Sequence, residues 1–330
     1  MLPIISIVIP TYNEEKHILD CLESIYTQDY PKNKLQVIIV DNHSKDNTLS
    51  LAKQYPVEVY KSTVMNSLFS KMIGLRKSKG EYFMYMDADN RYTQRDWIKT
   101  MLRPHKENEE LVGSFTDIVP NKRDPILSQY LASFSFYSSP LFKFFSIPVE
   151  KTITEKKKGY VLCRYEENRI PPTGSCLYNI KVLKKARIDR EEKFMDLDVL
   201  SLLVKRGYTL FAYNKTLGLY HTHMTSISQV YPKRKRNLDR NYIADLTKRH
   251  FTWVNFSNKL DVLKIALYIF YSYSLVFPFL VGIKKSFEHK RLFFVYLEPL
   301  VTVIETTAVI VAVIQNSQRN NFFRKILFAK

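Results

Sequence analysis

The chain has 330 residues, of which 45% are hydrophobic and 14% aromatic, enough to bury a sizeable core in one or two domains. Its 50 lysines and arginines against 32 aspartates and glutamates give a formal net charge of +18, which points to an anionic partner such as nucleotide phosphates, nucleic acid or an acidic membrane surface. Three scattered cysteines include no C-x-x-C pair and exclude a disulfide-stapled scaffold, so we expect reduced thiols in a cytosolic domain. The apolar start is too short for a signal peptide, and we expect none.

The first ninety residues alternate between predicted strands and predicted helices. Residues 4–9 are mostly β-branched, which predicts a buried parallel strand, and a helix with apolar side chains at helical spacing follows over 14–26, with Asn13 as its expected N-cap. The same alternation continues with strands predicted at 35–41, 57–60 and 82–86 and helices at 49–55 and 71–79. This order predicts a right-handed, doubly wound α/β fold with a mostly parallel sheet flanked by helices.

Acidic side chains stand at the ends of two of these strands. Asp41 ends the strand at 35–41, and Asp87 and Asp89 directly follow the strand at 82–86. The carboxyl ends of parallel strands meet at one edge of a sheet, so these acids and the residues after the first strand should line one crevice. Carboxylates as close as Asp87 and Asp89 repel each other unless a cation or hydrogen-bond donors lie between them, and a hard divalent cation prefers oxygen ligands. The motif alone also fits a surface turn with two solvated acids.

Three segments carry a more specific signal. SIVIPTYNEE, VIIVDNHSKDNT and KGEYFMYMDADN, in this order and spacing, resemble the N-terminal half of family-two glycosyltransferases. The competing fold, a dinucleotide-binding Rossmann unit, requires a G-x-G-x-x-G motif after the first strand, and the first glycine of this chain is Gly74. The resemblance implies a GT-A-like catalytic domain, which is a Rossmann-type α/β fold.

The resemblance also implies a donor site and a metal site. It implies that Asp41 accepts a hydrogen bond from the nucleotide base, that Asp87 contacts the ribose or the metal, and that Asp89 ligates Mg²⁺ or Mn²⁺ on the diphosphate. The family usually has Arg-Asn where this chain has Lys71 and Met72, so a cation is kept and an amide is lost. The donor-binding residues implied by the resemblance are Pro10, Tyr12, Glu14, Asp41, Lys71 and Asp87.

An acceptor site and a general base are implied further along the chain, where the resemblance resumes. Thr173 and Gly174 correspond to the residues near the acceptor in similar proteins. Counting back from the R-G-Y step that ends the next helix, the Glu-Asp pair of the family falls on Met195 and Asp196. The resemblance therefore implies that Asp196 is the general base, with Asp198 in a supporting role. The alternative is that Asp196 only caps the helix.

Two histidines, His221 and His223, follow the predicted acid. Residues one apart on a strand face the same side, so both imidazoles can approach one ligand. In similar proteins a histidine at this place completes the metal or diphosphate site, and the resemblance implies that His221 or His223 does so here. A structural histidine is the alternative.

A basic run of four cations extends from Lys233 to Arg236. The run lacks the interleaved aromatic residues of an RNA-binding segment, so we expect no nucleic-acid partner. We expect Lys233, Arg234 and Arg236 to lie against anionic lipid headgroups or an acceptor phosphate. Gln229 is present, but no tryptophan follows it nearby, so the Q-x-x-R-W motif of processive synthases is incomplete.

Two long apolar runs, 262–283 and 292–314, mark the last part of the chain, and a basic segment connects them. Each run has about the length that a bilayer span requires. If both crossed, the basic connection would face away from the catalytic domain, against the positive-inside tendency. One span, or a re-entrant or interfacial hairpin, would keep the cations cytosolic, and a buried helical pair in a soluble protein is the alternative.

The aromatic segment within 115–172 fits either a membrane-touching insertion or an ordinary core helix and loop.

Together these patterns predict an inverting, metal-dependent glycosyltransferase that uses a nucleotide-sugar donor and a lipid-linked or glycan acceptor, with Mg²⁺ or Mn²⁺ as cofactor. We expect a catalytic domain over 1–230, a basic juxtamembrane segment over 231–260 and membrane-associated helices over 261–330. The expected location is the cell membrane, with the catalytic domain in the cytoplasm. A nucleotidyltransferase and a non-catalytic membrane adaptor that keeps the fold are the two alternatives.

Overall fold

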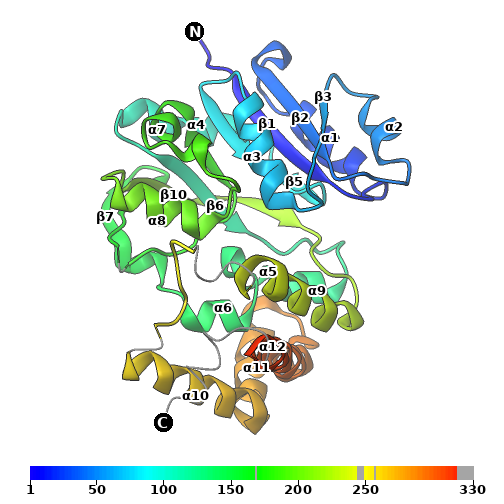
Figure 1. Ribbon diagram of the computed structural model, residues 1–330, viewed down its shortest axis with the longest axis vertical. Helices are drawn as coiled ribbons and strands as arrows, with labels where there is room; N and C mark the ends of the chain where they lie inside the picture. The colour runs from blue at the N-terminus through cyan, green and yellow to red at the C-terminus, as the bar shows by residue number, and fades with distance from the viewer. Residues whose placement is uncertain (168, 244–248, 256–257, 318–330) are drawn as a thin grey trace. The chain divides into compact units, whose positions relative to one another are not determined.

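The computed structural model describes residues 1–167, 169–243, 249–255 and 258–317. The chain forms two compact units (Figure 1). The first unit combines Met1–Val119 with Ile147–His221, and the second combines Pro120–Ser146 with Thr222–Lys330. This division follows packing, and it differs from the functional segments predicted above, which remain predictions.

A mixed sheet forms the centre of the first unit, with its strands in the order β3-β2-β1-β4-β9-β6-β10-β8-β7 and with β5 paired to β10. The four strands from β3 to β4 are mutually parallel, and so are β6 and β10, whereas the remaining pairs are antiparallel. The strands are β1 (Ile5–Thr11), β2 (Leu35–Asp41), β3 (Glu58–Lys61), β4 (Tyr82–Tyr85), β5 (Asn90–Tyr92), β6 (Gly113–Ile118), β7 (Ile153–Lys157), β8 (Tyr160–Arg164), β9 (Cys176–Asn179) and β10 (Leu210–His221). The predicted α/β fold with helices on the sheet is confirmed. The parallel strands from β3 to β4 are those that the sequence predicted at 4–9, 35–41, 57–60 and 82–86.

Helices cover both faces of the parallel part, which explains why β1 is buried along its whole length. Side chains of α1 and α4 pack against Ile5, Ile7 and Ile9 on one face. On the other face Gly74 of α3 lies against Val8 so closely that a Cβ atom on Gly74 would come within 2.2 Å of the valine side chain. The helices of this unit are α1 (Ile18–Tyr26), α2 (Thr48–Ala52), α3 (Ser67–Lys77), α4 (Trp97–Glu107), α7 (Ile180–Lys185) and α8 (Asp196–Lys205), with short turns η1 (Lys32–Lys34), η3 (Val149–Thr152) and η4 (Ile188–Arg190).

The prediction that Asn13 caps the first helix is wrong. α1 begins at Ile18 with His17 in the N-cap position. Asn13 has a left-handed backbone conformation with a φ of 55°, and its side-chain oxygen accepts a hydrogen bond from the backbone N–H of Lys45 at 2.8 Å. An asparagine in a left-handed turn therefore ties the loop after β1 to the loop after β2.

The second unit is helical. Within the aromatic segment of 115–172, residues 126–132 form a helix whose Leu127, Tyr130 and Leu131 are buried, as is Phe134 just after it, so this part is core rather than a membrane-touching insertion. The elements of the unit are α5 (Ile126–Ala132), η2 (Ser135–Tyr137), α6 (Pro140–Phe145), η5 (Ile227–Gln229), α9 (Val230–Asn237), the π-helical η6 (Leu238–Ile243), α10 (Lys259–Ser274), α11 (Val276–His289) and α12 (Phe294–Ser317).

The two apolar runs give three helices. Among the described helices, α12 is long and apolar enough to cross a membrane over Phe294–Asn316, although a buried core helix can have the same length and composition. The first run is divided at Leu275, where α10 and α11 meet at an angle of 78°. The pair reaches the length of a span only if its two bent arms are counted as one.

Candidate active site

The carboxyl ends of β1 and β2 bring Thr11 and Asp41 together. Asp41 is buried, and its Oδ1 accepts a hydrogen bond from Thr11 Oγ1 at 3.1 Å. Ser44, in the loop after β2, donates to the same carboxylate from its backbone N–H (3.0 Å) and from its hydroxyl (2.6 Å). These three donors fix the carboxylate at the end of β2. Of the other predicted donor residues in this region, Pro10 is buried in β1, Glu14 is half-buried and Tyr12 is exposed.

The two acids after β4 have different partners. The carboxylate of Asp87 lies 3.9 Å from the ammonium of Lys71, a buried residue of α3. Asp89 Oδ1 lies 3.4 Å from Nε2 of His221, the last residue of β10. The pairing of β10 with β5, in which His221 is opposite Asn90, brings this histidine to the acidic motif. The predicted proximity of the strand-end acid and a histidine is therefore present within the first unit.

Cys21 shows that the acids of this edge of the sheet are close together. The thiol is fully buried on α1, and its Sγ lies 3.9 Å from the backbone oxygen of Asp87. Burial raises the pKa of the Cys21 thiol, and the carboxylates of Asp89, Asp87 and Glu14 raise it further. Four residues from three separate segments thus share one electrostatic environment, as the strand-end rule predicts.

Asp196 is the first residue of α8, and its Oδ1 accepts a hydrogen bond from the hydroxyl of Tyr85 at 2.5 Å. Burial raises the pKa of the Asp196 carboxyl above its ordinary value, although part of the side chain remains accessible. The positive charge of Lys71 and the Tyr85 hydrogen bond act in the opposite direction, and the negative charge of Asp87 adds to the increase. A carboxylate with a raised pKa is a stronger base, and an accessible one can meet a substrate.

Tyr85 is the site residue that the sequence analysis did not identify. It lies at the end of β4, and its ring is 3.6 Å, from centroid to Nζ, below the ammonium of Lys71. Its hydroxyl also lies 3.3 Å from the backbone oxygen of Gly174, which has a left-handed φ of 55° that favours glycine. Tyr85 therefore connects the predicted base, the predicted acceptor loop of Thr173 and Gly174, and the lysine that pairs with Asp87.

Asp198 and Met195 flank the predicted base on α8. Met195 occupies the N-cap position without a side-chain hydrogen bond, and it is buried. Asp198 is buried in the first turn of the helix. The capping alternative for Asp196 is not favoured, because its side chain receives the Tyr85 hydroxyl and the N-cap position belongs to Met195.

The remaining predicted residues belong to the second unit. The expectation that His221 and His223 share one face of a strand is wrong, because β10 ends at His221 and His223 belongs to the second unit. The backbone oxygen of His223 accepts a hydrogen bond from Lys233 Nζ at 2.7 Å. Arg236 is exposed on α9. Arg234 differs from both, because its guanidinium is buried, pairs with Glu305 and stacks over the ring of Phe142 at 4.6 Å. The charge of Arg234 is engaged inside the unit, so the structure does not favour Arg234 as a contact for a phosphate or a lipid headgroup.

The residues at the acidic motif fit a metal only in part. Asp89 and His221 could supply an oxygen and a nitrogen ligand, and beside them the buried side-chain oxygen of Asn90 has no hydrogen-bond donor among the described residues. No group of three or more histidine, cysteine or acidic side chains in the described part of the chain could hold an ion by itself. Such a pair fits a cation that also binds substrate phosphates, which is how Mg²⁺ is usually held.

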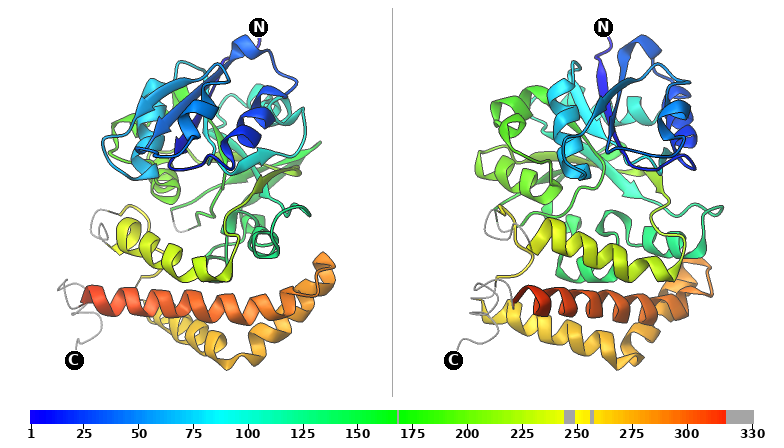
Figure 2. Two further views of the ribbon diagram at one scale, coloured as in Figure 1. Left: turned by 90° about the vertical axis from the view of Figure 1, so that its right-hand side faces the viewer. Right: turned by 45° about the vertical axis from the view of Figure 1, so that its right-hand side comes forward.

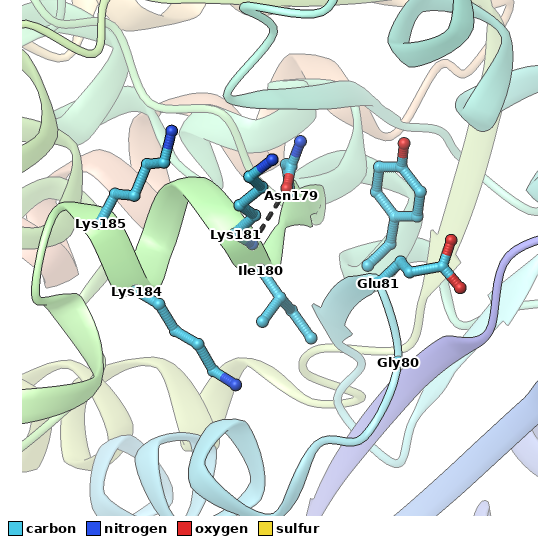
Figure 3. Close-up of a pocket in the computed structure, with 8 residues that line it drawn as sticks. Gly80, Glu81, Asn179, Ile180, Lys181, Lys184 and Lys185 are labelled. Atoms are coloured by element: carbon cyan, nitrogen blue, oxygen red, sulfur yellow. Dashed lines mark hydrogen bonds between the residues drawn. The ribbon is translucent and has the colours of Figure 1, made fainter.

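A pocket of about 510 Å³ lies elsewhere in the first unit, and Figure 3 shows its lining. It surrounds the start of β4 and the end of β9, and three exposed lysines of α7 border it. This is the edge at which the parallel strands begin, opposite the edge with Asp41 and Asp87. The lining residues are Gly80, Glu81, Tyr82, Asn179, Ile180, Lys181, Lys184 and Lys185. None of them is a predicted site residue.

Comparisons with known proteins agree with this geometry. The family model described as "Glycosyl transferase family 2" matches residues 6–170. A relative from Methanococcus voltae, named dolichyl N-acetyl-alpha-D-glucosaminyl phosphate 3-beta-D-2,3-diacetamido-2,3-dideoxy-beta-D-glucuronosyltransferase, is 28% identical over 232 residues, which are 66% of this chain and 67% of that protein. Glycosyltransferase AglE of Haloferax volcanii is 33% identical over 94 residues, 27% of this chain and 31% of that protein.

A solved structure shows the same fold. It is a mannosyltransferase from Pyrobaculum calidifontis in complex with GDP-Man and Mn²⁺, which superimposes with a TM-score of 0.57 at 16% sequence identity. The match covers 100% of this chain and 88% of that one. The family model spans half of the chain and includes the strands that carry Asp41, Asp87 and Asp89. The chain therefore belongs to glycosyl transferase family 2 and is a glycosyltransferase.

Proposed function

We propose that this glycosyltransferase is metal-dependent and inverting, and that it moves a sugar from a nucleoside-diphosphate donor to a hydroxyl of a lipid-linked or glycan acceptor. The observation that carries the proposal is the chain of contacts from Asp87 through Lys71 and Tyr85 to Asp196. It joins the acids that family resemblance assigns to the donor with the acid assigned to the acceptor. Inverting transfer needs this arrangement, with a leaving group on one side of the sugar and a base on the other.

On the donor side, Asp41 is a fixed acceptor for the base, and Tyr12 and Glu14 border the nucleotide. Asp89 and His221 would hold a divalent cation, with Asn90 beside them as a further oxygen donor. When bound, such a cation supplies positive charge against the departing diphosphate. The complex of the Pyrobaculum protein with GDP-Man and Mn²⁺ is consistent with this assignment. Lys71 adds a buried positive charge beside Asp87.

On the acceptor side, Asp196 removes the proton of the attacking hydroxyl. The acceptor oxygen forms the new bond to the anomeric carbon while the bond from that carbon to the diphosphate oxygen breaks, so the configuration inverts. The Thr173–Gly174 loop borders the acceptor, and Asp198 supports the base from the same helix turn. Burial around Asp196 favours this role, because it makes the carboxylate more basic than an exposed aspartate.

The proposed location is the cytoplasmic face of the cell membrane. One described helix has the length and composition of a span, and a bent helix pair has a comparable apolar stretch. The net charge of +18 favours an anionic surface. The name of the Methanococcus relative includes a dolichyl phosphate, which is consistent with a lipid-linked acceptor for this chain.

A panel of nucleotide sugars tests the function. We expect one donor class to stabilise the protein against heat only when Mn²⁺ or Mg²⁺ is present, because binding to the native state shifts unfolding by mass action. Transfer should then release a nucleoside diphosphate, and NMR of the product should show the inverted anomer. Release of pyrophosphate would indicate a nucleotidyltransferase instead. Failure of every donor and metal pair to bind would indicate the non-catalytic adaptor.

A further inference from the structure

Two buried carboxylates interrupt the apolar helix α12. Glu298 and Glu305 are 1% and 0% exposed. Glu298 pairs with Lys285 of α11 at 3.4 Å and accepts hydrogen bonds from the hydroxyls of Tyr130 (2.9 Å) and Tyr271 (3.2 Å). Glu305, near the midpoint of the helix, pairs with Arg234 of α9. Charges that are buried and paired in this way belong to the interior of the second unit rather than to a lipid-facing surface.

The partner of Glu305 determines what surrounds α12. Figure 2 shows α9, in yellow-green, running beside α12, in orange to red, with α10 and α11 on its other side. If α12 crossed a bilayer, its midpoint would lie at the centre of the hydrocarbon, and α9 would bring Lys233, Lys235 and Arg236 to that depth. Each such cation is costly there, by about 2.5–3.5 kcal/mol on the scale derived from insertion experiments. The end of α12 is also held by a polar contact, between Asn316 Nδ2 and Asp239 Oδ1 at 3.1 Å.

The helix pair α10–α11 exposes more large apolar side chains than α12, on which Tyr296, Leu300 and Ile314 are exposed. Its apolar side chains are exposed over both arms and across the bend, and ten of them, each at least 41% exposed, fall within 21 residues of sequence. They are Leu260, Val262, Leu263, Leu267, Phe270, Leu275, Val276, Phe277, Phe279 and Leu280. So many exposed apolar side chains on neighbouring helices mark a contact with a membrane or a protein.

The charges around this face favour a membrane. No charged residue occurs between Lys264 and Lys284, whereas lysines stand at both ends of the pair, and the side chains of Lys264 and Lys284 are 57% and 77% exposed. Cations at both ends of an apolar segment match the anionic headgroups of a single leaflet. The arms, of 16 and 14 residues, measure about 24 and 21 Å at 1.5 Å per residue, less than the hydrocarbon thickness of about 30 Å.

We propose that α10–α11 inserts as a bent wedge into one leaflet of an anionic bilayer, and that neither this pair nor α12 crosses the membrane. The chain is then a monotopic membrane protein, with the connection at 284–291 and the C-terminus on the same side as the first unit. This inference rests on the membrane location proposed above and adds the mode of attachment. Membrane binding and sidedness are measured without any donor, so failure of the wedge and failure of the glycosyltransferase function are distinguishable.

The binding test uses Phe270 of α10 and Phe277 of α11, which are exposed and whose rings lie 6.0 Å apart across the bend. The full chain is diluted from detergent onto phosphatidylcholine vesicles with and without phosphatidylglycerol, and flotation is measured. The double variant Phe270→Glu/Phe277→Glu should bind anionic vesicles at least tenfold more weakly, and the matched control Val64→Glu, at an exposed valine of the first unit, should bind normally. Equal binding by both variants, or dimerisation through this face in place of vesicle binding, would overturn the proposal.

The sidedness test uses the fact that Cys21, Cys163 and Cys176 are all buried, which keeps background labelling low. Lys290→Cys and, separately, a cysteine appended after Lys330 are expressed in bacteria and labelled with a membrane-impermeant maleimide in inverted membrane vesicles. We expect both cysteines to react from the cytosolic face. A single crossing by α12 would protect the appended cysteine, and two crossings would protect the cysteine introduced by Lys290→Cys. Either pattern refutes the monotopic arrangement.

Discussion

The hydroxyl of Tyr85 lies 2.5 Å from Oδ1 of Asp196, although the two residues are 111 positions apart in the sequence. A hydrogen bond donated to a carboxylate stabilises its charged form and lowers its pKa. Tyr85 thus opposes the effect of burial, which raises the pKa of Asp196. The balance determines the pH at which the proposed base is ionised.

Tyr85→Phe should therefore shift the acid limb of the pH–rate profile to higher pH. The acid limb should move by roughly one pH unit or more, since a hydrogen bond to a charged group contributes about 1.5–3 kcal/mol and one pH unit corresponds to about 1.4 kcal/mol. Donor affinity should stay the same. Tyr60→Phe is the matched control, because it removes a 3.0 Å tyrosine–carboxylate bond to Glu58 on the edge strand β3. An unchanged profile in Tyr85→Phe would show that the hydroxyl does not tune the base.

Asp196→Asn should remove transfer and preserve donor binding. The amide has nearly the same shape and keeps hydrogen-bonding capacity, but it cannot accept the acceptor proton. Loss of a general base typically costs about 10²–10⁴ in rate. Turnover and donor dissociation constants of Asp196→Asn and Asp198→Asn are measured in parallel. If only Asp198→Asn is inactive, the base is Asp198; if both are active, the acceptor is an already ionised group such as a phosphate.

Asp89→Ala should abolish the Mn²⁺-dependent thermal stabilisation by nucleotide. His221→Ala should lower the apparent affinity for Mn²⁺ in the presence of nucleotide by about tenfold or more, in the range seen when groups around a metal are altered. The physical reason is that the two side chains, 3.4 Å apart, would share one cation with the diphosphate. Thermal unfolding with nucleotide, with and without Mn²⁺, provides the measurement. Asp29→Ala, at an exposed acid of the same unit, should respond like the unaltered protein. Unchanged metal dependence in Asp89→Ala would rule this residue out as a ligand.

Arg234→Met should destabilise the second unit by about 3–5 kcal/mol, because it leaves the Glu305 carboxylate buried without its cation. The second oxygen of Glu305 already has no hydrogen-bond donor among the described residues, so no other group compensates. Adding Glu305→Gln to Arg234→Met should restore most of the loss. Unfolding midpoints in detergent compare the single and double variants with the exposed neighbour Arg236→Met. A small effect of Arg234→Met would mean that Glu305 is protonated or hydrated.

His105 should make the protein less stable as the pH falls below about 6.5. The ring is buried on α4, and burial lowers its pKa to about 4, so the unfolded chain binds a proton that the folded chain excludes between these values. The loss from this residue should reach about 2 kcal/mol at pH 5, at about 1.4 kcal/mol per pH unit. Urea unfolding at pH 7.5 and pH 5.0 should show a smaller pH effect in His105→Gln. An equal effect in both proteins would assign the pH dependence to other groups.

The sequence by itself determined the parallel part of the sheet and the acids at its edge. The segments at 5–9 and 37–40 are apolar apart from Ser6, so both faces of these strands must be covered. Parallel strands in a βαβ order with right-handed crossovers place Asp41 and Asp87 at one edge of the sheet. These features depend on short-range periodicity and on a general rule of chain topology.

Only the tertiary structure shows which distant residues the side chains of these elements contact. In the sequence Tyr85 is indistinguishable from the other buried residues of its strand. Its hydroxyl donates a hydrogen bond to Asp196 only because β4 and the start of α8 lie close together in the folded chain. Arg234 belongs to a run of cations predicted to contact lipid headgroups or an acceptor phosphate. It is instead buried and paired with Glu305 of the apolar helix α12. Hydropathy likewise marked two similar runs, whereas packing buried part of α12, including Glu298 and Glu305, and left more of the apolar side chains of α10–α11 exposed. Long-range pairing satisfies buried polar groups, and no local pattern encodes which distant residue will do so.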